Sequence, residues 1–285
     1  MLGIIAALAA AMMQSLQAAA NKKLVGTMPG PALLVRVYAM AAVLVSPLLI
    51  FSGIPRLNPT FFVAGTTGAL LNISASLFLL EALRRDSISR VFPFLTMAPL
   101  FSVLTAFIVL GELPSPQGGV GILLIVAGLM IVEYRALVPS DRSRQHTGVR
   151  YAVAAAFLFS LNVAADRLAI LHSHPFFYAP FFLGAGAVAL LLVWLARPTA
   201  LAPAPAPAHQ QQLLCMSALL LAASTTLTSF ALSVTLASYV SALKRFGVLM
   251  ALVWGGAVLK ERITWRLAAG SLLAVSGTLL IALTR

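Results

Sequence analysis

The sequence is poor in charge and almost free of cysteine. Of its 285 residues, 9% are charged and only Cys215 is a cysteine. A soluble globular domain typically has about a quarter of its residues charged, so this chain cannot cover itself with a water-facing surface. A single cysteine also excludes a disulfide framework and a metal site built from several thiolates. We therefore expect water not to be the main solvent of this protein.

Motifs for ATP hydrolysis and for catalysis are missing as well. The sequence contains no Gly-Lys-Ser or Gly-Lys-Thr phosphate loop, and no paired set of catalytic side chains stands out. His172 and His174 are close to each other, but no carboxylate or cysteine accompanies them nearby in the sequence. These absences argue against an ATP-driven pump and an enzyme, and we expect no metal and no cofactor.

Long apolar runs are abundant. Hydrophobic residues make up 61% of the chain, and a run of about 20 such residues spans the hydrocarbon core of a bilayer as a helix. Proline, glycine and charged residues divide the chain into ten runs, at residues 2–22, 31–52, 60–82, 88–111, 117–135, 150–171, 176–196, 211–233, 238–259 and 264–283. The sequence therefore predicts an all-α integral membrane protein with ten transmembrane helices.

The ten runs divide into two related halves. An offset of 149 residues aligns Ala82 with Ala231, Glu112 with Glu261, Gly121 with Gly270 and Gly128 with Gly277. An offset of 145 residues aligns Ser15-Leu16-Gln17 with Ser160-Leu161-Asn162, and Asn21-Lys22 with Asp166-Arg167. Five spans in each half force the second half to cross the membrane in the opposite direction. We predict two inverted five-helix repeats, 1–135 and 150–285, joined by a polar linker at 136–149.

The repeated glycines and glutamates have structural interpretations. Gly121 and Gly128 are seven residues apart, as are their counterparts in the second half, so each pair lies on one face of its helix. Small residues on one face let two membrane helices approach closely, and we expect packing to be their role. Glu112 and Glu261 each follow the end of a predicted helix, and we expect them to cap the N-terminus of the next one.

The repeated motif resembles that of a known family. Leu-Gly-Glu at 110–112 with Gly121 and Gly128 returns as Leu-Lys-Glu at 259–261 with Gly270 and Gly277, and Pro93 and Pro99 precede the first copy. This pattern resembles the EamA-type repeat of the drug/metabolite transporter superfamily over essentially the whole chain. The resemblance implies a carrier whose central cavity is lined by helices 1 to 4 and 6 to 9, with helices 5 and 10 at the seam between the halves.

Basic side chains inside apolar runs are candidates for solute binding. A charge at the centre of a bilayer costs about 3 kcal/mol or more, so such residues tend to have a function. On a helix, Lys244 and Arg245 share a sector of about 120° with Ser238 and Ser241. A phosphate could accept hydrogen bonds from the guanidinium and the ammonium together. The candidates are Arg36, Arg167, Lys244 and Arg245 with Ser238 and Ser241.

The pair Lys244-Arg245 is also similar to one in the plastid triose-phosphate transporters, relatives in the same superfamily. That resemblance implies that these two residues bind the phosphate of a substrate. The alternative is that both side chains extend to the membrane interface, or that they form internal ion pairs with Glu81 or Asp166.

Uncharged polar residues within the runs are further candidates to line a cavity. Gln14, Gln17 and Asn21 are spaced i, i+3, i+7 and form one polar stripe. Hydrogen bonds between helices are the alternative role for each such residue. The candidates for solute contact are Gln14, Gln17, Tyr38, Asn72 and Asn162, with Asn21, Ser224, Thr225 and Thr228 as further polar positions. Asp166 and Glu81 could exchange protons for coupling, although Asp166 and Arg167 could also form a helix-end pair.

These observations predict a secondary transporter that moves a small anionic, phosphate-bearing metabolite or lipid-linked headgroup by alternating access. One alternative is an exporter of neutral or amphipathic metabolites such as amino acids. Another is a membrane enzyme or scaffold that acts on polyprenyl-linked lipids. The net charge of +12 lies mostly at the ends of apolar runs, which favours lipid headgroups over nucleic acid as a partner. We expect a monomer in a cell membrane of the bacterial inner-membrane type.

The orientation in the membrane has two conflicting indications. Most basic residues lie in the loops that follow the odd-numbered runs, and the positive-inside rule then places both termini outside. The family resemblance implies that both termini are cytoplasmic.

Overall fold

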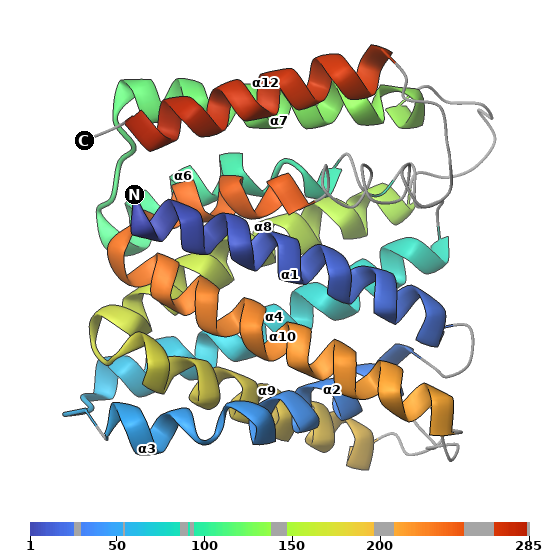
Figure 1. Ribbon diagram of the computed structural model, residues 1–285, viewed down its shortest axis with the longest axis vertical. Coiled ribbons are helices and arrows are strands. Elements are labelled where there is room, and N and C mark those ends of the chain that lie inside the picture. Colours follow the sequence, from blue (N-terminus) through green and yellow to red (C-terminus); the bar gives the residue numbers. More distant parts are fainter. Residues whose placement is uncertain are drawn as a thin grey trace. The chain divides into compact units, whose positions relative to one another are not determined.

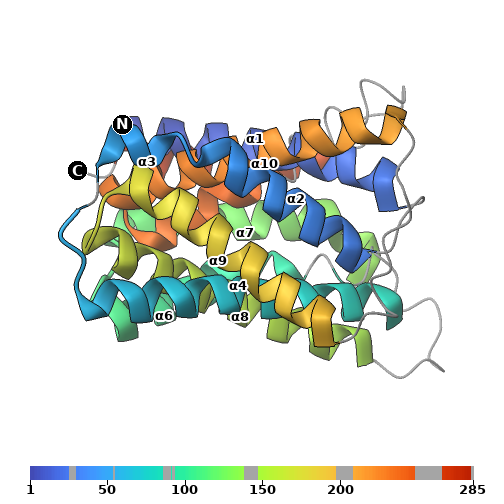
Figure 2. The same cartoon turned by 90° about the horizontal axis from the view of Figure 1, so that it is seen from below.

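A computed structural model describes residues 1–25, 30–53, 55–85, 91, 94–137, 147–196, 208–247 and 265–283. All regular secondary structure in these ranges is helical, which confirms the all-α prediction (Figures 1 and 2). The helices are α1 (Leu2–Val25), α2 (Gly30–Val45), α3 (Leu48–Ser52), α4 (Pro59–Arg85), α6 (Ala98–Leu110), α7 (Pro116–Leu137), α8 (Thr147–Leu171), α9 (Pro175–Ala196), α10 (Ala208–Val234) and α12 (Trp265–Leu283). Residues 237–247 are also helical.

Several of these helices can cross a membrane. Within the described ranges, five stretches are long and apolar enough: Ala32–Ile50, Pro59–Leu79, Gly148–Leu171, Pro175–Val193 and Gln210–Val234. Large apolar side chains such as Ile108, Leu123 and Val188 are exposed on the helices, which suits contact with lipid and not with water. The chain is therefore a multi-pass membrane protein, and the count of ten spans stays a prediction.

One predicted helix is interrupted by a proline. The predicted run 31–52 contains α2, a turn at Ser46 and Pro47, and the short helix α3. Pro47 has no N–H to donate, and its ring clashes with the preceding helical turn. The run is still a single apolar stretch, so its hydrophobicity alone did not indicate the break.

A second predicted helix begins later than expected. The run 88–111 contains α6, which starts at Ala98 after a turn at Thr96 and Met97. Pro99 lies at the second position of α6, where its missing N–H has no helical partner to lose. Residues 88–90, 92 and 93 of this run lie outside the described residues, as do residues 248–259 of the ninth run.

The chain divides into two compact units, each of which combines segments from both halves of the sequence. The α1 unit comprises Leu2–Ile73 and Ala165–Val234. The α7 unit comprises Met1, Ser74–Ala164 and Thr235–Arg285.

In the α7 unit, α7 and α12 pack along each other (Figure 1). A Cβ atom on Gly121 would lie 2.7 Å from the carbonyl oxygen of Gly277, and one on Gly128 would lie 2.4 Å from that of Gly270. The residue number falls along α12 as it rises along α7, so the two helices run antiparallel. This confirms that the repeated glycines permit close backbone contact.

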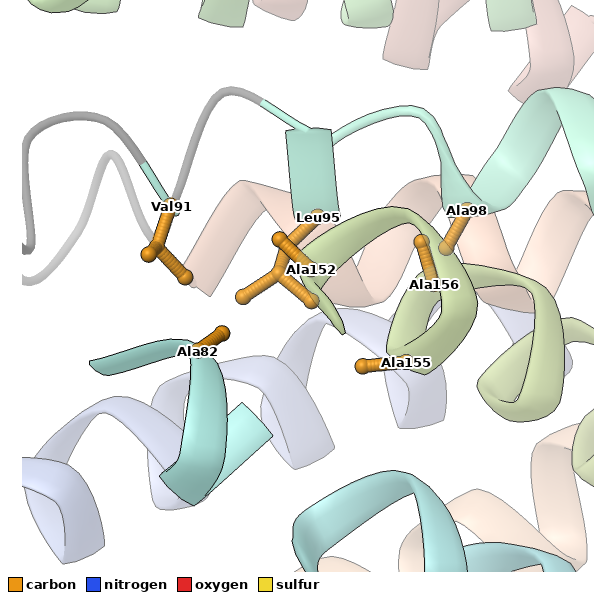
Figure 3. Packing of buried hydrophobic residues seen from close by; sticks show 7 residues of the cluster. All are labelled: Ala82, Val91, Leu95, Ala98, Ala152, Ala155 and Ala156. Carbon is orange, nitrogen blue, oxygen red and sulfur yellow. The ribbon is translucent and has the colours of Figure 1, made fainter. Parts of the chain in front are cut away.

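Small side chains also bring α4, α8 and the start of α6 together in the α7 unit. Figure 3 shows their cluster, in which three alanines of α8 lie next to Leu95 and Ala98. Alanine dominates this core, so the helix backbones can approach closely. The members are Ala82, Val91, Leu95, Ala98, Ala152, Ala155 and Ala156.

In the α1 unit, α1 packs along α10, and α2 packs against α9 and α10 (Figures 1 and 2). The start of α4 is fixed to the start of α9 by aromatic rings. Phe61 is fully buried, and its ring centroid lies 5.7 Å from that of Phe177 and 4.8 Å from that of Phe181. This aromatic contact positions Tyr178, whose ring lies edge-on to Phe61.

Candidate functional site

Asp166 is a buried acidic residue of the α1 unit. It lies in the last turns of α8 with 8% of its surface exposed. The hydroxyl group of Tyr178, which α9 contributes, donates a hydrogen bond of 2.6 Å to Asp166 Oδ1. Tyr178 is itself almost completely buried. A charge-assisted hydrogen bond in such a place is short and strong, and it fixes the carboxylate between α8 and α9.

Helix α4 lies against this pair through a glycine. A Cβ atom on Gly68 would lie 2.5 Å from Asp166 Oδ1 and 3.2 Å from the hydroxyl oxygen of Tyr178. Any side chain at position 68 would therefore displace the carboxylate or the hydroxyl. Three helices meet at Asp166, and the sequence interpretation found only one of the three residues involved.

Tyr38 and Asn72, two residues predicted to line a cavity, contact each other. The Tyr38 hydroxyl donates a hydrogen bond of 2.8 Å to Asn72 Oδ1, which joins α2 to α4. A Cβ atom on Gly186 would lie 2.8 Å from the Tyr38 ring, so α9 supports the ring from another side. The Tyr38 hydroxyl is also within electrostatic range of Asp166. The α1 unit thus collects three of the predicted polar positions in one region.

The polar stripe of α1 takes part in contacts with α10. The Ser217 hydroxyl donates a hydrogen bond of 2.6 Å to Asn21 Oδ1, and the Ser224 hydroxyl donates one of 3.1 Å to the carbonyl oxygen of Ala10. Gln17 is partly exposed and Gln14 is exposed. For Asn21 the structure therefore shows the interhelical hydrogen bond that was the alternative to solute contact.

Two further polar groups of the α1 unit lie on α8 and α10. The Arg167 guanidinium donates a hydrogen bond to the carbonyl oxygen of Leu232, near the end of α10. Thr228 is buried, and its Oγ1 finds no hydrogen-bond partner within the described part of the chain. Arg36, a predicted solute contact, is partly buried in α2.

Helix 237–247 carries the predicted anion site in the α7 unit. Ser238 and Ser241 are buried, with 1% and 5% of their surfaces exposed, while Lys244 and Arg245 are partly buried. Asn162, another predicted contact, is buried in the part of α8 that belongs to the same unit. The hydroxyl groups are therefore inside the protein, and the two cations lie one to two turns further along.

Glu112 and the residues around it hold the start of helix 237–247. Gly111 ends α6 with a φ of 68°, and its N–H bonds to the carbonyl oxygen of Phe107. The following Glu112 accepts a hydrogen bond of 3.1 Å from the backbone N–H of Ala237, at the first turn of the helix. Glu112 was predicted to cap the next helix in the chain, but it caps one from the other half of the sequence.

Tyr239 forms the second attachment of this helix. Its hydroxyl oxygen accepts a hydrogen bond of 3.0 Å from the backbone N–H of Ser115, the residue before α7. The Ser115 side chain in turn accepts one of 3.1 Å from the N–H of Gly118 and so caps α7. A Cβ atom on Gly118 would overlap the Tyr239 hydroxyl, at 1.9 Å. The sequence interpretation had assigned no role to Tyr239.

Glu81, the second predicted coupling residue, belongs to an ion pair at the end of α4. Its carboxylate lies 2.7 Å from Arg85 Nε and 3.7 Å from Arg84 Nη1, and both arginines are exposed. The hydrogen bond from Arg85 to Glu81 raises the pKa of this arginine, and its guanidinium also lies over the ring of Tyr151. Ion pairs of this kind near the surface stabilise a fold little, and the coupling role of Glu81 stays a prediction.

The sequence interpretation missed Gly68, Ser217, Tyr178 and Tyr239, which contact the predicted residues. One signal for two of them was present, because the offset of 149 residues aligns Gly68 with Ser217 and Ala69-Leu70-Leu71 with Ala218-Leu219-Leu220. Among the described residues, no three His, Cys, Asp or Glu side chains gather into a group that could hold a metal ion.

Comparison with known proteins assigns the chain to a family. The sequence matches the EamA-like transporter family at residues 1–134 and again at residues 146–283. The chain belongs to this family. EamA-like proteins are membrane transporters of small solutes within the drug/metabolite transporter superfamily.

A solved structure supports the fold. A chain titled "Crystal structure of protein" matches with a TM-score of 0.81 and 16% sequence identity, over 99% of this chain and 96% of that one. At 16% identity this similarity supports the fold of the EamA-like chain and says nothing about its function. No curated protein matches the sequence.

Proposed function

We propose that this EamA-like protein is a secondary transporter for a small anionic solute that carries a phosphate group, free or at the head of a lipid. The observation that supports this function is the adjacent pair Lys244 and Arg245, which are the charged residues of helix 237–247. Two neighbouring cations repel each other, the more so where they are partly shielded from water, and an anion between them relieves that repulsion. A phosphate offers enough oxygens for the planar guanidinium and the ammonium together.

The surroundings of helix 237–247 suit this role. Ser238 and Ser241 precede the cations on the same face and are buried, so hydroxyl groups are available beside the charges. Glu112 and Tyr239 fix the first turn of the helix. Lys244 lies seven residues from Ala237, about 10 Å along the helix axis from that attachment. A helix held at its start keeps both cations in place before the solute arrives, which lowers the cost of binding.

Alternating access of two inverted halves is the proposed mechanism of movement. In the repeat, Gly121 aligns with Gly270, and Gly128 aligns with Gly277. In the structure the contacts are crossed, because Gly121 lies against Gly277 and Gly128 lies against Gly270. An antiparallel contact of this reciprocal kind is what two repeats related by a two-fold axis would make. Movement of the two repeats against each other would expose a solute site to each side of the membrane in turn.

The experiment compares phosphate esters with the alcohols from which they derive. A ligand that binds the folded state raises its stability by about 2.7 kcal/mol at a concentration 100 times Kd, and thermal unfolding in detergent reports this. We expect glycerol 3-phosphate or a related ester to stabilise the protein and the matched alcohol not to do so. Lys244→Ala and Arg245→Ala should each lose the stabilisation.

The control variant is Arg56→Ala, which removes an exposed cation between α3 and α4. It should be stabilised by the ester as the unchanged protein is. Equal stabilisation of all three variants would contradict the proposal. Stabilisation by neutral amino acids alone would instead support an exporter of neutral metabolites.

We also propose that a single chain transports, in a cell membrane of the bacterial inner-membrane type. The family match occurs twice, so one chain already contains two copies of the repeat. Reconstitution at less than one chain per vesicle measures this directly. Uptake should persist at that dilution, and its disappearance would show that a dimer is required.

A further inference from the structure

Two equivalent pairs of positions in the two halves of the chain make contacts of different chemistry. The offset of 145 residues aligns Asn21 of α1 with Asp166 of α8, and the offset of 149 aligns Gly68 of α4 with Ser217 of α10. In the structure, Asn21 contacts Ser217 and Asp166 lies against Gly68. The same pair of repeat positions therefore meets twice, once as amide and hydroxyl and once as carboxylate and glycine.

The difference between the two contacts lies in a group that can be charged. In the first contact, the Ser217 hydroxyl satisfies Asn21 Oδ1, and neither side chain can take up or lose a proton near neutral pH. In the second, no side chain occupies position 68, and the hydroxyl of Tyr178 reaches Asp166 Oδ1 instead. At the equivalent position of the first half a neutral amide makes the contact, so the carboxylate is particular to the second half.

A carboxylate in a membrane-spanning helix costs free energy that an amide would avoid. Asp166 lies within the apolar stretch Gly148–Leu171 and is 8% exposed. Ionisable residues inside membrane helices are rare for this reason, and those that occur commonly bind ions or carry protons. The repeat thus supplies an internal comparison between a neutral amide in the first half and an ionisable carboxylate in the second.

We propose that Asp166 is the proton-binding residue that couples solute movement to a proton gradient, and that Tyr178 positions its carboxylate. This inference rests on the proposed transport function. The carboxylate takes one proton from water on one side of the membrane and becomes a neutral acid. It returns that proton to water on the other side when the site faces there. No other bond is formed or broken, and the charge in the α1 unit changes by one.

The neighbours of Asp166 suit a site that changes its charge. Tyr178 from α9 donates the hydrogen bond, and the Tyr38 hydroxyl from α2 lies within electrostatic range. Arg167 on α8 itself and Arg36 on α2 are charged side chains on described helices of the α1 unit, and Arg167 donates to the carbonyl oxygen of Leu232. On α4 the nearest residue is Gly68, which brings no titratable group. Binding of a proton would neutralise Asp166 and change its electrostatic interaction with these groups. The packing of α8 against α4 and α9 would change as a result.

The first test does not depend on the identity of the solute. Infrared difference spectra of the protein in lipid, recorded between low and high pH, should contain the C=O band of a carboxylic acid that disappears in Asp166→Asn. This variant reproduces the chemistry of Asn21 in the first half, so it should fold. In Tyr178→Phe the band should remain but change its frequency, because the carboxyl group loses a hydrogen-bond partner. An unchanged frequency would show that Tyr178 does not bind the protonated carboxyl group and so does not position it.

The comparison variant is Glu81→Gln, which removes the partly exposed carboxylate of the ion pair at the end of α4 and should keep the band. If Asp166→Asn folds and its difference spectrum retains the band, Asp166 does not bind the proton and the proposal is overturned.

The second test uses glycerol 3-phosphate in proteoliposomes. A pH gradient should drive accumulation of this ester by the unchanged protein. Asp166→Asn should abolish that accumulation but keep exchange of the labelled ester between equal concentrations. Equal accumulation by the variant would contradict coupling through Asp166. If the unchanged protein transports no ester at all, the proposed solute class is wrong. The infrared band would still decide whether Asp166 binds a proton.

Discussion

The carboxylate of Glu112 accepts a hydrogen bond of 3.1 Å from the backbone N–H of Ala237, a residue 125 positions later in the chain. This contact joins the end of α6 to the helix that carries Lys244 and Arg245. The N–H groups of a first helical turn have no partner within the helix, and a carboxylate both satisfies one of them and complements the helix dipole.

Removing this cap should loosen the start of helix 237–247. We expect Glu112→Ala to lower the free energy of unfolding by about 1 kcal/mol, within the usual range of 0.5–2 kcal/mol for a lost cap. Hydrogen exchange should then increase in residues 237–247. Glu112→Gln keeps an acceptor oxygen and should retain most of the protection. Unchanged exchange in Glu112→Ala would show that Tyr239 alone holds the helix.

The glycine contact between α7 and α12 gives a second prediction. Gly121→Ala would place a Cβ atom 2.7 Å from a backbone oxygen of α12, which cannot move aside as a side chain could. Overpacking of this kind costs about 1–3 kcal/mol, so the thermal unfolding temperature in detergent should fall. Gly119→Ala on the same helix meets no atom within 4 Å and should be neutral or slightly stabilising. Equal effects of the two substitutions would argue against the close contact.

The close approach of α4 to Asp166 gives a third prediction. Gly68→Ala should displace the carboxylate or the Tyr178 hydroxyl, because the new Cβ atom would lie 2.5 Å from Asp166 Oδ1. We expect a loss of stability of about 1–3 kcal/mol and a change in any carboxyl infrared band of Asp166. The control is Gly184→Ala in α9, where a Cβ atom meets nothing within 4 Å. A variant with full stability and an unchanged band would show that α4 is not packed on Asp166.

The helical architecture could be predicted because its cause is local. Uninterrupted apolar runs of membrane length fix the class of fold, and the glycines at intervals of seven residues indicated the face on which α7 meets α12. The break at Pro47 was harder to predict. Membrane helices tolerate proline, so a proline by itself does not tell whether a helix kinks or ends.

The partners of the candidate residues were mostly beyond prediction. That Asp166 would meet Tyr178 depends on how α8 packs on α9, and nothing in the spacing of either helix specifies this contact. Glu112 was expected to act as a cap, yet its partner Ala237 lies in the other half of the chain. The alignment of Gly68 with Ser217 was available in the sequence, but its meaning needed the contacts that both positions make.

The shape of the cation at position 245 can be tested separately from its charge. Arg245→Lys keeps the positive charge on helix 237–247 but replaces a planar fork of donors with a point charge. A net hydrogen bond to a charged group is worth about 1.5–3 kcal/mol, and 1.4 kcal/mol is tenfold in affinity. If Arg245 binds a phosphate with two parallel hydrogen bonds, Arg245→Lys should weaken the binding of glycerol 3-phosphate about tenfold or more, measured by calorimetry.

The matched exchange is Lys244→Arg, which also keeps the charge and should cost less, because a phosphate oxygen accepts equally well from either group. Neither substitution should alter the unfolding temperature of the protein without ligand, since both side chains are only partly buried. Equal binding by the unchanged protein and by Arg245→Lys would mean that position 245 supplies charge alone. In that case a carboxylate or a single phosphate oxygen, and not a forked contact, would define the solute that this helix selects.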